Sequence, residues 1–481
     1  MSLKQKSAEG LKWSFIETIG VRLFSVSTYF VLAKLLDPVV FGIVALTNTF
    51  VYFSEIFVEQ GFVAALVQRK NLEQAHLSSA FWGNLGLGGI FFVLTYLGAP
   101  GVASLYDEPL LTDLLRVHAI TYLLSSSVKV QLALLQRELL LKTVAIARTV
   151  AIVVSCVVSI AMAYRGYGAW ALVLQQIIFN GVQAVLLWIM NSWRPTLTFS
   201  WPHYREIFGF GSKVMLNRTT TYLVRYADTL LIGYFLGTGP LGYYSFAQKI
   251  FITLTELVDL TYTRVTFSVF SLLQDQKAEL SRKFYQFIDS VALVSIPLFS
   301  AAFVFSPIAI PLVFGEKWLN SIPVVQILSV AGVLTCFYAC TNNLFAGIGR
   351  VGLNLRIKLM YLGLSLLLMY GAVQFSIEAV AVTYILAMLV TLATMLFYIR
   401  RFISIKVSAY VVSLVRPLAV SLLIAALIHA SMYLFDDVTW PIFILQAFLS
   451  GTIYVTFLLL SKPELFESLK ILSAVNKAKT R

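Results

Sequence analysis

Long apolar segments alternate with short polar connections along the whole chain of 481 residues. A helix that crosses about 30 Å of hydrocarbon needs roughly twenty mostly apolar residues, and a single soluble core cannot use many such segments. Segments of this kind lie at residues 12–34, 39–67, 77–99, 112–136, 142–164, 168–191, 206–236, 240–270, 284–310, 321–346, 352–373, 377–399, 408–432 and 440–460. The pattern predicts an all-α membrane protein with about 14 transmembrane helices.

The composition agrees with this interpretation, because 59% of the residues are hydrophobic and only 12% are charged. Soluble domains contain about 25% charged residues. The net charge of +13 raises the question of nucleic-acid binding, but the basic residues lie in short connections and no separate polar domain presents them. We therefore expect no nucleic-acid partner and interpret the basic residues as signals of membrane topology.

Most basic residues in and next to the connections lie on one side of the predicted topology. With an internal N-terminus, that side comprises both termini and the connections that contain Arg69, Lys70, Arg137, Lys142, Arg194, Arg205, Lys277, Arg282, Lys283, Arg350, Arg356, Lys358, Arg400, Arg401 and Lys406. The opposite connections contain only Lys34, Arg165 and Lys317. Because cytoplasmic loops carry an excess of Lys and Arg, both termini are predicted to be cytoplasmic.

Two segments of similar sequence, LLDPVVFGIVALTN at 35–48 and FLGTGPLGYYSFAQ at 235–248, begin 200 residues apart. Each ends one apolar segment, turns, and starts the next with an apolar residue followed by glycine, Gly42 or Gly242. When the two segments are aligned with this offset of 200 residues, Glu59 corresponds to Asp259. Glycine turns resemble one another by chance, but the coincidence of turns and acids favours an internal repeat, which is common in secondary transporters.

The repeat predicts three regions along the chain. Residues 1–200 and residues 201–400 are two halves with six predicted helices each, related by pseudo-symmetry. Residues 401–481 add two transmembrane helices and a cytoplasmic tail.

Ionisable residues inside the apolar segments concentrate in the first two helices of each predicted half. They are Glu17, Arg22, Glu55 and Glu59 in the first half, and Lys213, Arg218, Arg225, Asp228, Lys249, Glu256, Asp259 and Arg264 in the second. A charge at the bilayer centre costs roughly 2.5–3.5 kcal/mol, so such residues face protein or a water-filled cavity. Several share a helix face at spacings of three, four or seven residues, which favours a polar central cavity. The alternative is structural pairing, such as Arg225 with Asp228, and snorkelling lysines.

Motifs for covalent chemistry are absent from the sequence. No Gly-Lys dipeptide occurs, so an ATP-binding loop of the Gly-Lys-Ser/Thr type is excluded. The four histidines, His76, His118, His203 and His429, show no ligand spacing and are each expected to be solitary. The cysteines Cys156, Cys336 and Cys340 lie in apolar segments and are expected to act as small hydrophobic residues. We therefore expect no cofactor, no metal site, no catalytic residues and no enzymatic activity.

Several motifs resemble a known family. They occur in the expected order as VLAKLLDPVVFGIVAL (31–46), LLQRELLLKTVAIART (134–149), GYGAWALV (166–173), RYADTLLIGYFLGTGPLGYYSFAQKI (225–250), FGEKWLNSIPVVQIL (314–328) and AGIGR (346–350). The sequence resembles the polysaccharide-export, or oligosaccharide flippase, branch of the multidrug/oligosaccharidyl-lipid/polysaccharide (MOP) transporter superfamily, close to the colanic-acid and teichuronic-acid exporters. The resemblance implies two six-helix bundles arranged as a V plus two C-terminal helices.

The resemblance also implies a site and a substrate. The first, second, seventh and eighth helices would line the cavity, where Arg22, Arg218, Arg225 and Arg264 are candidates for binding a diphosphate. Candidates for ion coupling or sugar binding are Glu17, Glu55, Glu59, Asp228, Glu256 and Asp259. The chain would flip undecaprenyl-pyrophosphate-linked oligosaccharide units from the cytoplasmic to the outer leaflet of the bacterial inner membrane by alternating access, coupled to H⁺ or Na⁺. Its expected partners are this lipid-linked oligosaccharide, membrane lipids and polysaccharide-assembly proteins.

Two other functions remain open at this point. A drug/cation antiporter of the same superfamily would share the fold, although the charged helix faces favour an anionic amphiphile. A membrane polysaccharide polymerase or ligase would carry a large external loop with arginines and histidines, whereas the predicted outer connections are short and contain few basic residues.

Overall fold

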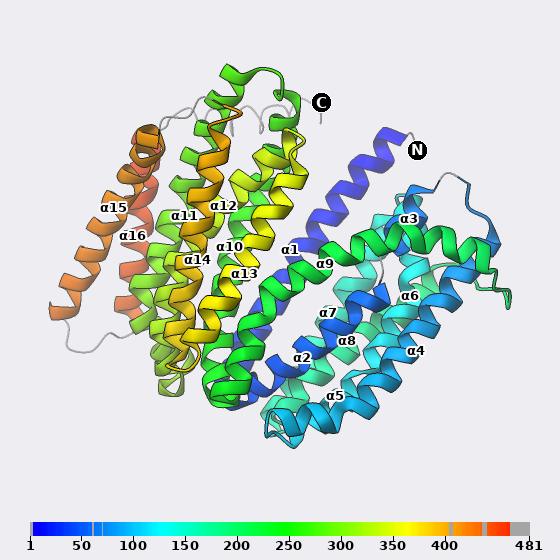
Figure 1. The fold of residues 1–481 in the computed structure, drawn as a ribbon. Coiled ribbons are helices and arrows are strands. Elements are labelled where there is room, and N and C mark those ends of the chain that lie inside the picture. Colours follow the sequence, from blue (N-terminus) through cyan, green and yellow to red (C-terminus); the bar gives the residue numbers. More distant parts are fainter. Residues whose placement is uncertain (1–2, 60–61, 70, 404–406, 435–439, 462–481) are drawn as a thin grey trace. The chain divides into compact units, whose positions relative to one another are not determined.

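The computed structural model describes residues 3–59, 62–69, 71–403, 407–434 and 440–461 (Figure 1). Within these ranges the regular secondary structure is entirely helical. The all-α fold class predicted from the sequence is thus confirmed. The chain divides into two compact units, unit 1 at Met1–Ser245 and unit 2 at Phe246–Arg481.

Unit 1 contains nine helices and the start of a tenth in its described part. They are α1 (Leu3–Leu35), α2 (Pro38–Glu59), α3 (Phe62–Gln68), α4 (Gln74–Leu105), α5 (Leu110–His118), α6 (Ile120–Arg137), α7 (Leu141–Tyr164), α8 (Ala169–Met190), α9 (Trp201–Leu236) and the first residues of α10 (Thr238–Leu272). Helix α1 packs on α7, α7 on α8, α4 on α5 and α6, and α2 on α9. Apolar side chains from α3, α4 and α6 surround Phe81 and Leu66 and form one core of this unit.

Unit 2 contains the rest of α10 and the helices that follow it. They are α11 (Lys277–Phe314), the 3₁₀ helix η1 (Glu316–Ser321), α12 (Ile322–Gly347), α13 (Val351–Ala372), α14 (Ile377–Ile399), α15 (Val407–Leu434) and α16 (Trp440–Ser461). Helix α11 packs on α12 and α15, and α14 packs on α12 and α13. The buried Trp318 ring of η1 stacks on Phe246 with 4.3 Å between the ring centroids.

Every apolar segment predicted from the sequence coincides with helix in the described part. Residues 39–59 lie in α2 and residues 62–67 lie in α3, whereas residues 112–136 form most of α5 and α6, with a break at Ala119. Ten helices in the described part are long and apolar enough to cross a membrane. Helices α9 and α10 are not among them, because polar and ionisable residues interrupt their apolar sequence. Large exposed side chains such as Leu367 (72% exposed) and Phe448 (70%) suit contact with lipid.

The first turns of α2 and α10 meet at the two glycines of the sequence repeat. A methyl group at Gly42 would overlap the carbonyl oxygen of Thr238, and one at Gly242 would overlap the carbonyl oxygen of Pro38. Pro38 and Thr238 each begin their helix, so each glycine packs on the start of the other helix. Small residues allow this kind of close backbone approach between membrane helices. The reciprocal contact gives the sequence repeat a physical basis.

We expect Gly42→Ala to destabilise unit 1, because the added methyl group forces the α2–α10 contact apart. Overpacking of this kind costs about 1–3 kcal/mol. The measurement is the thermal unfolding midpoint of the purified protein in detergent. Gly89→Ala in α4 is the matched control, since a methyl group there meets nothing within 4 Å. Equal midpoints for the two variants would contradict a tight contact at Gly42.

Candidate functional site

An aromatic interface joins α2 to α9 within unit 1. The Tyr222 hydroxyl of α9 donates a 2.7 Å hydrogen bond to the carbonyl oxygen of Thr49 in α2. The Tyr222 ring also contacts Phe53 of α2 and Tyr226 of α9, with centroid distances of 5.2 Å and 4.9 Å. Tyr52 of α2 approaches Tyr226 at 6.1 Å. The two helices are therefore held by rings that also present hydroxyl groups.

Two of the charged residues predicted from the sequence lie at this interface. Half-buried Glu55 and exposed Arg225 both lie within electrostatic range of Tyr52 and Tyr226. The Arg225 guanidinium carbon lies 5.8 Å from the Tyr226 ring centroid, in the range of a cation–π contact. A guanidinium beside tyrosine rings can bind a phosphate group, and the rings and a carboxylate can bind sugar hydroxyls. We call Glu55, Arg225, Tyr52, Tyr222 and Tyr226 the α2–α9 cluster.

Asp228 lies one turn beyond Arg225 on α9 but in a different environment. Its side chain is buried, with 4% of the residue exposed. Oδ2 accepts a 2.8 Å hydrogen bond from the Tyr244 hydroxyl, and Oδ1 accepts bonds from the Thr229 amide (2.7 Å) and hydroxyl (3.3 Å). A carboxylate this deep in a membrane protein is costly unless it is hydrogen-bonded, and here several donors surround it.

The other predicted residues of unit 1 lie on α1 and α2. Glu17 accepts a 2.6 Å hydrogen bond from the Arg148 guanidinium of α7, so it forms an ion pair between α1 and α7. Arg148 was missed by the sequence analysis, although a single arginine in the apolar 142–164 segment was a visible signal. Arg22 is half-buried on α1. The Glu59 side chain lies outside the described part of the structure.

Helix α10 carries the predicted residues that belong to unit 2. Glu256 is half-buried, whereas Asp259 is exposed and lies within electrostatic range of Cys336 on α12. The side chain of Arg264, like that of Arg218 on α9, lies outside the described part of the structure. Their roles in diphosphate binding therefore stay predictions.

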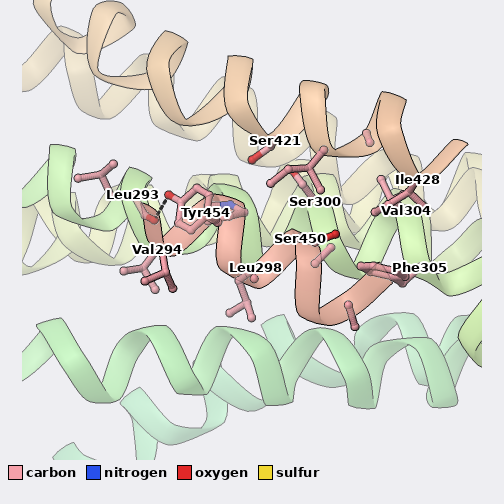
Figure 2. A pocket seen from close by; sticks show the side chains of 17 residues that line it. Leu293, Val294, Leu298, Ser300, Val304, Phe305, Ser421, Ile428, Ser450 and Tyr454 are labelled. Carbon is pink, nitrogen blue, oxygen red and sulfur yellow. Dashed lines mark hydrogen bonds between the residues drawn. The ribbon is translucent and has the colours of Figure 1, made fainter. Parts of the chain in front are cut away.

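Unit 2 contains a groove that the sequence analysis did not predict. It has a volume of about 500 Å³ and lies between α11, α15 and α16 (Figure 2). Apolar side chains form most of its wall, including Leu298, Phe305 and Ile428. Hydroxyl groups are few, and the Tyr454 hydroxyl at one side is bound to the carbonyl oxygen of Leu293. The wall suits a hydrocarbon chain. In a sequence, the apolar residues of a groove cannot be distinguished from the apolar residues of a core. The sequence therefore contained no signal that predicts this groove.

Two histidines that were expected to be solitary lie together, which corrects that expectation. The rings of His76 on α4 and His203 on α9 make an edge contact with 4.3 Å between their centroids. They lie far apart in the sequence and at the starts of their helices, so only the fold brings them together.

Three comparisons place the chain among known proteins. The sequence profile of a family described as polysaccharide biosynthesis protein matches residues 31–323. The chain is similar to the teichuronic acid biosynthesis protein TuaB of Bacillus subtilis, with 26% identity over 87% of this chain and 88% of TuaB. It is similar to the lipopolysaccharide biosynthesis protein WzxC of Escherichia coli, with 26% identity over 74% of this chain and 73% of WzxC.

Solved structures agree at the level of the fold. The lipid II flippase MurJ in an inward closed conformation matches 95% of this chain and 100% of its own, with a TM-score of 0.72 and 14% identity. An inward-facing MATE transporter of the MOP superfamily matches 79% of this chain and 94% of its own, with a TM-score of 0.57 and 16% identity. Because the profile matches more than half of the chain, the chain belongs to the polysaccharide biosynthesis protein family.

Proposed function

We propose that this protein flips a polyprenyl-diphosphate-linked oligosaccharide, of the undecaprenyl type, from the cytoplasmic to the outer leaflet of the bacterial inner membrane. Both termini would lie in the cytoplasm, as the basic connections predict. The proposal rests chiefly on the α2–α9 cluster, where Arg225 and Glu55 lie among tyrosines. Membership of a polysaccharide biosynthesis family supports a substrate that contains sugars. A cation beside hydroxyl-bearing rings suits a diphosphate with sugars attached.

The substrate's lipid part has a chemical match in the groove of unit 2. A polyprenyl chain is hydrocarbon throughout, and the groove between α11, α15 and α16 has a predominantly apolar wall. A drug/cation antiporter would need a site for a cation, whereas the exposed charge of the α2–α9 cluster is that of Arg225. This supports an anionic amphiphile over an organic cation as the substrate.

Transport requires a source of energy, and we propose that a cation supplies it through Asp228. A buried carboxylate can exchange a proton or bind Na⁺ as its surroundings open and close. Alternating access would couple that exchange to movement of the lipid-linked sugar.

The function is tested by deleting the gene and restoring it as wild type or as Arg225→Ala. We expect the deletion strain to accumulate lipid-linked oligosaccharide on the cytoplasmic leaflet, seen after lipid extraction. Arg225→Ala should restore export about 10- to 100-fold less well, because a charge-assisted bond contributes about 1.5–3 kcal/mol. Arg282→Ala, which removes an exposed arginine paired with Glu279, is the matched control. Lost drug resistance without lipid accumulation would instead indicate the antiporter.

Asp228→Asn tests the proposed coupling, because the amide cannot release a proton or supply the same charge. In proteoliposomes we expect this variant to lose the stimulation of flipping by an imposed H⁺ or Na⁺ gradient. Tyr244→Phe is the control, since it removes a hydrogen bond from Asp228 and keeps the carboxylate. A normal response of Asp228→Asn to both gradients would show that coupling lies elsewhere.

Gly451→Phe tests the groove by filling it. Gly451 belongs to its wall, and a Cβ atom there meets nothing within 4 Å, so the larger side chain can extend into the groove and the fold should tolerate the change. We expect weaker binding of a long polyprenyl-linked substrate and little change for a short-chain analogue, as measured by flipping at limiting substrate. An equal effect on both substrates would argue against a lipid tail in the groove.

A further inference from the structure

The starts of α4 and α9 are joined at one end of unit 1. The linker from residue 191 to residue 200 runs along the first turns of α4 and is held there by hydrogen bonds. The Trp82 indole donates to the carbonyl oxygen of Thr196 (2.8 Å), and the Ser200 amide donates to the Ser79 hydroxyl (2.8 Å). These bonds fix the position at which α9 begins relative to α4.

Metal-binding side chains converge at this junction. Glu73, immediately before α4, His76 in its first turn and His203 in the first turn of α9 each offer a ligand atom, and these three atoms lie within 4.8 Å of one another. The Glu73 Oε2 to His203 Nε2 distance is 3.9 Å. A tetrahedral zinc ion with bonds of about 2.0–2.2 Å needs ligand atoms about 3.3 Å apart, so small side-chain movements would close the site.

His76 supplies an independent sign that a ligand is needed. Only 3% of the residue is exposed, and its Nε2 atom is buried without a hydrogen-bond partner. Glu206 is the nearest carboxylate, but its Oε2 lies 3.8 Å away and is bound to Arg69 at 2.5 Å. A buried ring nitrogen without a partner is costly, and a bound ion is one way to satisfy it.

The surroundings of the two rings are compatible with metal binding through Nε2. The His203 Nδ1 lies 2.5 Å from the Ser200 hydroxyl oxygen, which can accept a hydrogen bond from the Nδ1–H group and leave Nε2 for the metal. In His76, Nδ1 accepts a 3.3 Å bond from the Glu73 amide. Binding through Nε2 places the ring proton on Nδ1, so this long and weak bond is given up.

We propose that Glu73, His76 and His203 bind one Zn²⁺ ion that joins α4 to α9. Two imidazoles and one carboxylate form a ligand set that zinc accepts, with water as the fourth ligand. The Arg69 guanidinium holds Glu206, so Glu73 provides the carboxylate. The ion would hold the start of α9, the helix that carries Arg225 and Asp228, but the site does not depend on the proposed transport function.

The experiment is a titration of the purified full-length protein in detergent after treatment with EDTA. Zn²⁺ binding is followed by calorimetry, and Co²⁺ is used as a probe whose visible absorption reports tetrahedral coordination. We expect one equivalent per chain and a higher thermal unfolding midpoint with Zn²⁺. Glu73→Gln and His203→Ala should each weaken binding at least about tenfold. Both side chains are partly exposed, so these variants should keep the fold, which circular dichroism checks.

Glu279→Gln is the matched control, because it removes a carboxylate in unit 2 that pairs with Arg282. It should bind Zn²⁺ as the wild type does. The proposal is overturned if the wild type shows no saturable binding, or if both cluster variants bind Zn²⁺ with unchanged affinity. Because the readout is metal binding, a failed export assay would leave this result intact, and the reverse also holds.

Discussion

The close backbone contact between the first turns of α2 and α10 sets the arrangement of the polar groups in unit 1. Gly42 and Gly242 each lie against the start of the opposite helix, where any side chain would overlap a carbonyl oxygen. Tyr244 follows two residues after Gly242 and bonds to Asp228, while α2 presents Thr49 and Tyr52 to α9. A wider separation of the helices would remove these donors from their acceptors. Packing of the smallest residues thus determines where the hydroxyl groups lie.

Three charged side chains of the apolar segments of unit 1 have different surroundings. Asp228 is buried among hydroxyl and amide donors, Glu17 is paired with Arg148, and Arg225 is exposed beside a tyrosine ring. The first two arrangements hold the charge in place, since removing a partner would leave an unsatisfied group in a medium of low dielectric constant. An exposed guanidinium has no such constraint and is open to a ligand. This difference separates Arg225 from Asp228 and Glu17.

The sequence was sufficient for the helices but only partly for the site. Apolar length located the long helices, because a membrane demands a minimum span. The offset between Gly42 and Gly242 indicated a repeat, but it did not predict that the two glycines would pack on each other's helices. Arg225 and Glu55 were among the ionisable residues predicted to face a cavity, and the fold brings both to the same tyrosines. The pairing of Glu17 with Arg148 and of His76 with His203 could not be deduced, because each joins helices distant in sequence. The groove of unit 2 was hidden for another reason: its residues are as apolar as those facing lipid.

The polar character of α9 and α10 also bears on how the chain is assembled during synthesis. A helix enters the bilayer alone when its apolar residues outweigh its charges, and each central charge opposes entry by about 2.5–3.5 kcal/mol. These two helices are not among the ten in the described part that are long and apolar enough to cross a membrane. They would have to be retained beside the insertion machinery until neighbouring helices supply polar partners. The two helices that carry most of the predicted site residues would therefore depend more on the rest of the chain for their insertion than the apolar helices do.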